Sequence, residues 1–181
     1  MAQRTKFALA LNKTKGKFNI SVLPLTKLWK LSSDTFNFQE IITSIPTITE
    51  IDKVKVFCDL GKIAFDIERK TLTKYDDNVE IDLGGIAKGY IAEKVVSTLK
   101  ENGIYDGYIS LGSSSLYIFN VNSLSIRHPR RNQNLSEIIK LNGSLIENKH
   151  ISTSGDYERY YEYKGVRYCH IIDTETGAPT Q

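Results

Sequence analysis

The chain has 181 residues, of which 40% are hydrophobic and 25% charged, as is typical of one globular domain or of a piece of a larger one. Its formal net charge of +3 is too small to indicate a nucleic-acid partner, so we expect none. No apolar run approaches the roughly 18 residues that a membrane-spanning helix needs, so none of these residues is expected to span a membrane.

The N-terminal half predicts short elements separated by turns. The spacing of the apolar residues favours a helix over residues 6–15 and an extended segment over residues 18–23. Pro24 then begins a short turn whose apolar residues share one face. Alternating apolar residues on both sides of a turn at residues 60–62 predict a hairpin over residues 53–67.

One long amphipathic helix is predicted in the middle of the chain. A turn at residues 76–78 and a short strand over residues 79–81 precede it, and Asn102-Gly103 is a typical helix end. Its core-facing side is predicted from four apolar residues at four-residue spacing: Ala87, Ile91, Val95 and Leu99.

The second half predicts short strands at close intervals. Five are expected, over residues 108–111, 116–119, 124–127, 138–141 and 150–154. A final hairpin joins residues 157–163 to residues 166–172 through a turn at Lys164-Gly165. The predicted fold is therefore α+β, a mostly antiparallel sheet system with packed helices, and residues 1–181 are treated as a single domain.

The first candidate site is the segment from Asp82 to Gly89, Asp-Leu-Gly-Gly-Ile-Ala-Lys-Gly. Two glycines between a strand and a helix expose backbone N–H groups beside the positive end of the helix dipole, an arrangement that suits a pyrophosphate. Lys88 would add a cation there. The alternative is a glycine-mediated connection in which Asp82 is an ordinary helix cap.

The second candidate is the turn that runs from Ser152 through Thr153 and Ser154 to Asp156. Its hydroxyl and N–H groups could hold a diphosphate or a ribose. The alternative is a polar turn in which Asp156 bonds to its own backbone.

The third candidate is His170. Strand alternation places it on one face with Tyr168 and Ile172. A histidine among apolar neighbours can be a core residue, but an imidazole that titrates near neutral pH is also suited to take a proton from a hydroxyl nucleophile.

The fourth candidate is the segment over residues 14–25, with Trp29 behind it. Core packing by a chain reversal is one interpretation. The other is that Phe18 and Trp29 flank an isoalloxazine or adenine ring, because flat aromatic side chains offer a large contact area.

Three of these segments occur in an order that resembles a known family. They are Ile81-Asp-Leu-Gly-Gly-Ile-Ala-Lys-Gly-Tyr90, Ile151-Ser-Thr-Ser-Gly-Asp-Tyr-Glu-Arg159 and Tyr168-Cys-His-Ile-Ile-Asp-Thr-Glu-Thr-Gly177. Together they resemble the ApbE family, the FAD:protein FMN transferases. The resemblance implies an enzyme that cleaves FAD with the help of Mg²⁺ and attaches FMN through a phosphoester bond to a threonine of a target flavoprotein. It also implies an extracytoplasmic, membrane-associated protein that meets the membrane only through a lipid anchor.

The resemblance also implies roles for particular residues. Flavin and FAD contacts are expected from Lys17, Phe18, Asn19, Asp82, Lys88 and, beside the nucleotide, Ile172. Gly85 occupies the position whose backbone carbonyl reaches the metal, and His170 that of the histidine that activates the threonine.

The chain departs from the family pattern at several positions. Asn19 replaces an aspartate, the serines at 113–115 replace a glycine-rich turn, and Thr174 replaces a proline. Family members also continue beyond the Pro179 segment into an Asp-x-x-x-Asp-Thr metal motif and begin earlier than this chain, so we expect a partial ApbE-like domain. Three hypotheses remain: a transferase, an FAD-binding protein without transferase activity, and an inactive remnant.

Overall fold

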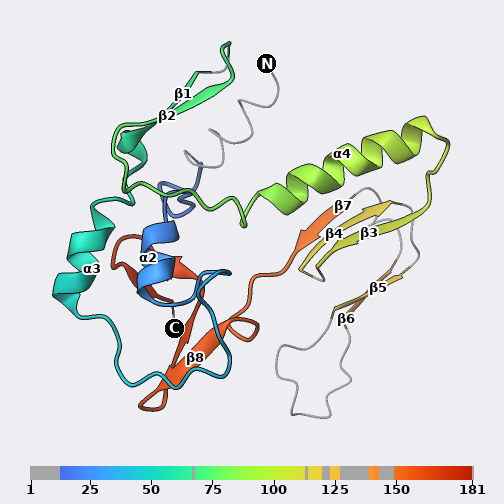
Figure 1. Ribbon diagram of the computed structural model, residues 1–181. Coiled ribbons are helices and arrows are strands. Elements are labelled where there is room, and N and C mark those ends of the chain that lie inside the picture. Colours follow the sequence, from blue (N-terminus) through green and yellow to red (C-terminus); the bar gives the residue numbers. More distant parts are fainter. Residues whose placement is uncertain are drawn as a thin grey trace. The chain divides into compact units, whose positions relative to one another are not determined.

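The computed structural model describes residues 13–66, 68–112, 114–119, 123–126, 139–142 and 149–180. The chain forms two compact units (Figure 1). Unit 1 consists of Met1–Asp82 and Glu158–Gln181, and unit 2 consists of Leu83–Tyr157. The single domain over residues 1–181 stays a prediction. Most of the helix expected over residues 6–15 lies outside the described residues.

The described part of unit 1 includes two short helices before its first strand. Helix α2 (Leu23–Leu28) carries Pro24 in its first turn, where the fixed φ of proline favours helix entry. Helix α3 (Ile48–Lys55) begins with a capping box: the Thr47 hydroxyl accepts from the Glu50 N–H, and the Glu50 carboxylate accepts from the Thr47 N–H.

Helix α3 shows that the hairpin predicted over residues 53–67 was wrong in its first half. The capping box fixes a helix start at Thr47, and the short alternation after Lys53 does not outweigh it. The hairpin is displaced along the chain: β1 (Ile63–Asp66) follows the 3₁₀ turn η1 (Leu60–Lys62) and pairs antiparallel with β2 (Thr71–Lys74). The extended segment predicted over residues 18–23 is wrong at its end, because Leu23 begins a helix and residues 20 and 21 form a turn. The strand predicted over residues 79–81 is not formed.

The C-terminal part of unit 1 is a pair of hairpins. Strand β8 (Tyr160–Tyr163) pairs with β9 (Val166–Cys169), and β10 (Ile172–Asp173) pairs with β11 (Ala178–Pro179). The predicted turn at Lys164-Gly165 is confirmed, and its two positive φ angles, 50° and 78°, suit a tight hairpin.

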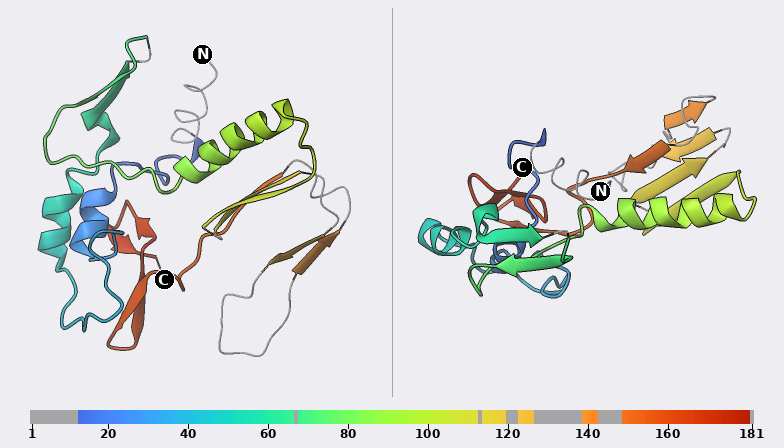
Figure 2. Two further views of the ribbon diagram at one scale, coloured as in Figure 1. Left: turned by 45° about the vertical axis from the view of Figure 1, so that its right-hand side comes forward. Right: turned by 90° about the horizontal axis from the view of Figure 1, so that it is seen from above.

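The described residues of unit 1 form two apolar clusters. The larger lies where α2 and α3 adjoin the C-terminal strands (Figure 2). Its buried members are Leu25, Trp29, Leu31, Ile51, Cys58 and Ile172. The smaller consists of Ile20, Ile63 and Val79, with Phe18, Leu60 and Ile81 packed against them.

Unit 2 is a helix on an antiparallel sheet. Helix α4 (Ala87–Glu101) lies along the sheet β3 (Gly107–Leu111), β4 (Ser115–Phe119) and β7 (Lys149–Ser152), which has the order β3-β4-β7 (Figure 2). A separate ladder pairs β5 (Ser123–Ile126) with β6 (Ile139–Asn142). The five predicted strands are confirmed to within one or two residues at each end.

The helix itself is confirmed, but its predicted core face is partly wrong. Ala92 and Val96 are buried against the sheet, whereas Ile91 is 47% exposed and Val95 39% exposed. Strict four-residue spacing drifts around a helix of 3.6 residues per turn, so it marks the packed stripe poorly. The helix ends as predicted, because the Gly103 and Ile104 N–H groups bond to the last carbonyls in a Schellman motif.

Candidate functional site

The predicted site residues fall into two groups, one in each unit. Unit 1 contains Lys17, Phe18, Asn19, Asp82, His170 and Ile172. Unit 2 contains Gly85, Lys88, Ser152, Thr153 and Ser154.

The loop around Phe18 in unit 1 is fixed by local hydrogen bonds. The Phe18 N–H donates to the Thr14 hydroxyl at 3.1 Å, and Lys15 and Gly16 both have positive φ angles, 51° and 83°. The Phe18 ring is half-buried against the smaller apolar cluster. Trp29 is 3% exposed and stacks on Tyr168 with ring centroids 5.4 Å apart, so the structure shows core packing for this side chain.

Asn19 uses both ends of its amide. Its oxygen accepts from the Ser21 N–H at 2.8 Å and the Ser21 hydroxyl at 2.7 Å, and its nitrogen donates to the Cys58 carbonyl at 2.6 Å. A backbone N–H can only donate and a carbonyl can only accept, so the chemistry of the partners fixes the amide orientation. Asn19 therefore donates a hydrogen bond to the Cys58 carbonyl that an ionised aspartate could not donate.

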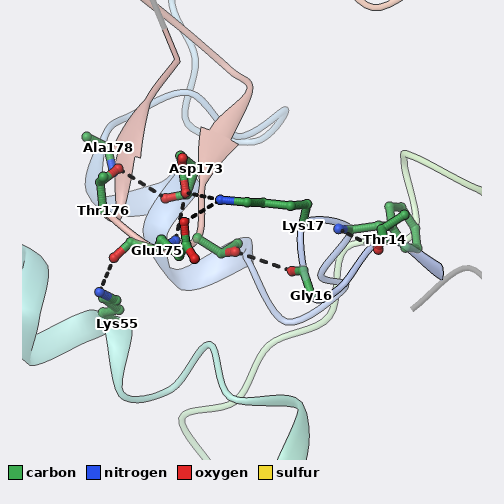
Figure 3. Close-up of polar contacts among 10 residues, drawn as sticks. Thr14, Gly16, Lys17, Lys55, Asp173, Glu175, Thr176 and Ala178 are labelled. Atoms are coloured by element: carbon green, nitrogen blue, oxygen red, sulfur yellow. Dashed lines mark hydrogen bonds and ion pairs between the residues drawn. The ribbon is translucent and has the colours of Figure 1, made fainter. Parts of the chain in front are cut away.

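Lys17 contacts two carboxylates (Figure 3). Its Nζ lies 2.5 Å from Glu175 Oε2 and 3.6 Å from Asp173 Oδ1. The hydrogen bond that Lys17 donates to the Glu175 carboxylate is the main cause that raises the pKa of Lys17. The hydrogen bond from the Glu175 backbone N–H is the main cause that lowers the pKa of Asp173. Lys17 and Asp173 are therefore both charged at neutral pH.

Asp82 is joined to the same loop, because its N–H donates to the Ile20 carbonyl at 2.7 Å. It does not cap α4, contrary to one of the two interpretations above. The helix begins at Ala87 with Ile86 at the cap position, and the N–H groups of both residues bond to the Leu83 carbonyl.

His170 lies in a bend after β9 rather than within a strand, so the face predicted for residues 166–172 is interrupted. The backbone N–H of His170 donates to the Arg159 carbonyl at 3.1 Å, and the ring nitrogen Nδ1 lies 3.3 Å from the same oxygen. A carbonyl accepts only, so that contact requires a proton on Nδ1 and leaves the lone pair of the neutral ring on Nε2. Ile172 is 9% exposed, and its side chain belongs to the larger apolar cluster.

In unit 2, Ser114 joins three of the relevant segments. Its hydroxyl contacts Nζ of Lys88 in the first turn of α4, and its carbonyl accepts from the Thr153 N–H at 2.8 Å. One residue further on, the hydroxyl of Ser115 lies 3.4 Å from that of Ser152. A cation, several hydroxyl groups and a helix N-terminus are thus gathered at one place, and residues 152–154 are exposed.

The turn that follows needs a glycine. A Cβ on Gly155 would lie 2.4 Å from the Tyr157 ring, closer than real side chains approach. This glycine lets the chain pass the Tyr157 ring directly after the hydroxyl-bearing residues.

Known proteins support a family assignment. The model of the ApbE family matches residues 2–181. The chain belongs to the ApbE family. An FAD:protein FMN transferase of Klebsiella pneumoniae is 31% identical over 163 residues, covering 90% of this chain and 48% of that protein. Another, of Vibrio cholerae, is 31% identical and covers 96% of this chain and 51% of that protein. The chain thus spans about half the length of these curated relatives.

Solved structures agree on the fold. The ApbE protein of Thermotoga maritima has a TM-score of 0.77 at 28% identity, covering 99% of this chain and 56% of that one. The flavin transferase ApbE of Vibrio cholerae has a TM-score of 0.74 at 28% identity, covering 98% and 54%. The predicted α+β fold of an ApbE flavin transferase is confirmed.

The metal expected for an ApbE protein finds little support from side chains. Within the part of the chain that the structure describes, no three His, Cys, Asp or Glu residues gather as a metal would require. Gly85 lies in an exposed turn just before α4, and its role as a carbonyl ligand stays a prediction. These described side chains by themselves therefore do not make a Mg²⁺ site. The same described residues contain no helix that is long and apolar enough to cross a membrane.

Two sets of contacts in this ApbE chain were not predicted from its sequence. The sequence shows Ser114 only as one of the serines that replace a glycine-rich turn, and its contact with Lys88, 26 positions away, has no local signal. The pairing of Glu175 with Lys17 spans 158 positions, and no local pattern indicates it.

Proposed function

We propose that this chain is the part of an FAD:protein FMN transferase that binds FAD and contributes the proton acceptor for transfer. The support is membership of the ApbE family and relatives of that name, about 31% identical over most of this chain. The structural observation that carries the proposal is the polar cluster around Ser114 at the start of α4.

That cluster suits a pyrophosphate for electrostatic reasons. Lys88 supplies a full positive charge, α4 supplies the positive end of its dipole, and Ser152 and Thr153 supply donors at the edge of β7. Hydrogen bonds between a charged donor and an anionic oxygen are among the stronger ones in proteins. The Lys88–Ser114 contact holds the ammonium group beside the serine turn before FAD binds.

His170 would act on the acceptor. With its Nδ1 proton turned to the Arg159 carbonyl, Nε2 carries the lone pair that accepts the proton of a threonine hydroxyl. The threonine oxygen then bonds to the FMN phosphorus, the bond from that phosphorus to the oxygen of AMP breaks, and AMP leaves with the bonding electrons. The threonine acceptor, the Mg²⁺ requirement and an extracytoplasmic, lipid-anchored location are finer parts of the proposal that rest on the family resemblance alone.

The binding step is tested by calorimetric titration of FAD into the chain, the Lys88→Ala variant and a control, Lys94→Ala. Lys94 is exposed on the same helix and contacts the Tyr90 ring. Loss of a charged hydrogen-bonding partner costs about 1.5–3 kcal/mol, so Lys88→Ala should weaken binding by about tenfold or more. No FAD binding by the unaltered chain, or equal losses in both variants, would contradict the proposal.

The transfer step is tested with an acceptor flavoprotein and Mg²⁺, by measuring AMP release and flavin that stays bound to the acceptor after denaturation.

A second candidate function, FAD binding without transfer, is favoured by the lack of a metal-ligand cluster among the described residues. FAD binding without AMP release would select this second candidate, and covalent flavin on the acceptor would exclude it.

A further inference from the structure

Two segments of unit 1 that lie 158 positions apart in sequence are tied together by charge (Figure 3). On one side is Lys17, in the loop that precedes Phe18. On the other are Asp173, the last residue of β10, and Glu175, in the turn between β10 and β11. We call Lys17, Asp173 and Glu175 the ionic clasp.

Two hydrogen bonds to backbone carbonyls lie beside the clasp. The Thr174 hydroxyl donates to the Gly16 carbonyl at 3.4 Å, one residue before Lys17. The Lys55 ammonium group, from the end of α3, donates to the Glu175 carbonyl. The turn is therefore attached both to the loop and to α3.

Hydrogen bonds within the turn hold its shape, and one more links it to Trp29 in the core. The Glu175 N–H donates to Asp173 Oδ1 at 2.8 Å, and the Gly177 N–H donates to the Asp173 carbonyl at 2.7 Å. The Gly177 carbonyl in turn accepts from the buried Trp29 indole at 2.8 Å. A movement of Glu175 is therefore expected to shift the Gly177 carbonyl and the Trp29 indole bonded to it.

We propose that Lys17 is a positioning residue and not a direct FAD ligand. The ionic clasp holds the loop with Phe18 and Asn19 against the hairpin that begins at Ile172, two residues after His170. This inference rests on the proposed function, because it assigns a role to a residue expected to contact the flavin.

The charges around Lys17 support this assignment. Two carboxylates lie against its ammonium group, and with Lys55 nearby the cluster has two positive and two negative charges. A pyrophosphate would find no net positive field there and would have to displace a carboxylate. The contrast with Lys88 is direct, because that ammonium group contacts a neutral hydroxyl.

A charge-swap experiment separates positioning from direct contact. Lys17→Glu and Glu175→Lys are each expected to raise the Kd for FAD about three- to tenfold, since each places like charges together. The double variant restores an opposite-charge pair, so its Kd should return to within about twofold of the unaltered chain. If Lys17 bound FAD directly, Glu175→Lys would leave binding nearly unchanged and the swap would not rescue it, which would overturn the proposal.

A matched control in unit 1 is the cross-strand pair of Glu162, which is exposed, and Arg167, which is half-buried, 3.0 Å apart. Glu162→Lys should leave the Kd for FAD unchanged. High salt should reduce the difference in the Kd for FAD between Glu175→Lys and the unaltered chain, because salt screens exposed charges.

Hydrogen exchange of the ligand-free chain separates failure of the clasp from failure of the proposed function. Both single variants should speed exchange of the amides of Lys17 and Phe18, and the swap should restore slow exchange. If the unaltered chain binds no FAD, the exchange result alone decides the clasp, and the lack of binding counts against the proposed function. Unchanged exchange in both single variants overturns the clasp whatever FAD does.

Discussion

Asn19 offers a sharp test of how this site is built. In Asn19→Asp, a carboxylate oxygen replaces the amide nitrogen that lies 2.6 Å from the Cys58 carbonyl. The two bonds from Ser21 survive, because a carboxylate accepts as an amide oxygen does. The third contact becomes a repulsion between two acceptors. Leaving a partly buried acceptor unsatisfied costs about 1–3 kcal/mol, so we expect the free energy of unfolding to fall by about that amount.

The measurement is urea unfolding followed by the fluorescence of Trp29, the only tryptophan in the chain. Asn37→Asp is the matched control. Asn37 is exposed and its oxygen accepts from the Gln39 N–H at 2.9 Å, a role that an aspartate can fill. This control should change the free energy of unfolding by no more than about 0.5 kcal/mol. Equal losses in the two variants would refute the argument that the amide donor matters.

Four further variants test the frame of unit 1 by the same unfolding assay. Gly177→Ala should lower the free energy of unfolding by about 2–4 kcal/mol, because Gly177 has a φ of 73° and a Cβ there would lie 2.5 Å from Ile51. Gly165→Ala is the control: its φ is 78° but the space around it is open, so it should cost only about 1–2 kcal/mol. Equal costs would contradict the steric argument. Thr47→Ala removes the cap of α3 and should cost about 1 kcal/mol, with a smaller helix signal in circular dichroism; no change would mean that the cap is dispensable. The hydrogen bond from Lys62 lowers the pKa of Asp76, so this carboxylate stabilises the fold above its ordinary pKa of 3.8, and the stabilisation is lost as the pH falls through the lower folded value. Asp76→Asn should therefore reduce the dependence of the free energy of unfolding on pH in this acid range. An unchanged dependence would exclude the Lys62–Asp76 pair as its source.

The elements that the sequence predicted well carry their signal locally. Helix α4 is long, periodic and closed by Asn102-Gly103. The turn at Lys164-Gly165 has a positive φ at both residues, as a tight hairpin turn requires, and its glycine is the local signal. Helix α3 was missed because its signal was a cap at Thr47 rather than an apolar period. Which stripe of α4 packs could not be read from spacing, because the sheet decides it.

The candidate site divides in the same way. Residue types and loops at Lys88, residues 152–154 and His170 were visible in the sequence, because glycine, hydroxyl and imidazole groups are chemically distinctive. Their partners were not, since the contacts with Ser114 and Arg159 arise only when distant segments meet. The same limit applies to the ionic clasp, whose two sides are joined only by the fold.

The departures from the family pattern acquire a common meaning from these contacts. Asn19 donates to the Cys58 carbonyl, Ser114 contacts Lys88, and Thr174 donates to the Gly16 carbonyl. Each replacement therefore makes a bond that the usual family residue could not make: aspartate and proline lack the donor, and glycine lacks a side chain.

Restoring the family residue should therefore harm this chain. Thr174→Pro removes the bond to the Gly16 carbonyl, and it should speed hydrogen exchange of the loop amides at Lys17 and Phe18. Thr174→Val keeps the shape of the side chain without the hydroxyl and should have the same effect, which separates the lost bond from the rigidity of proline. If exchange stays slow in both variants, the ionic clasp alone holds the loop and the departure at Thr174 is neutral. If it speeds up only with proline, backbone geometry and not the hydroxyl is responsible.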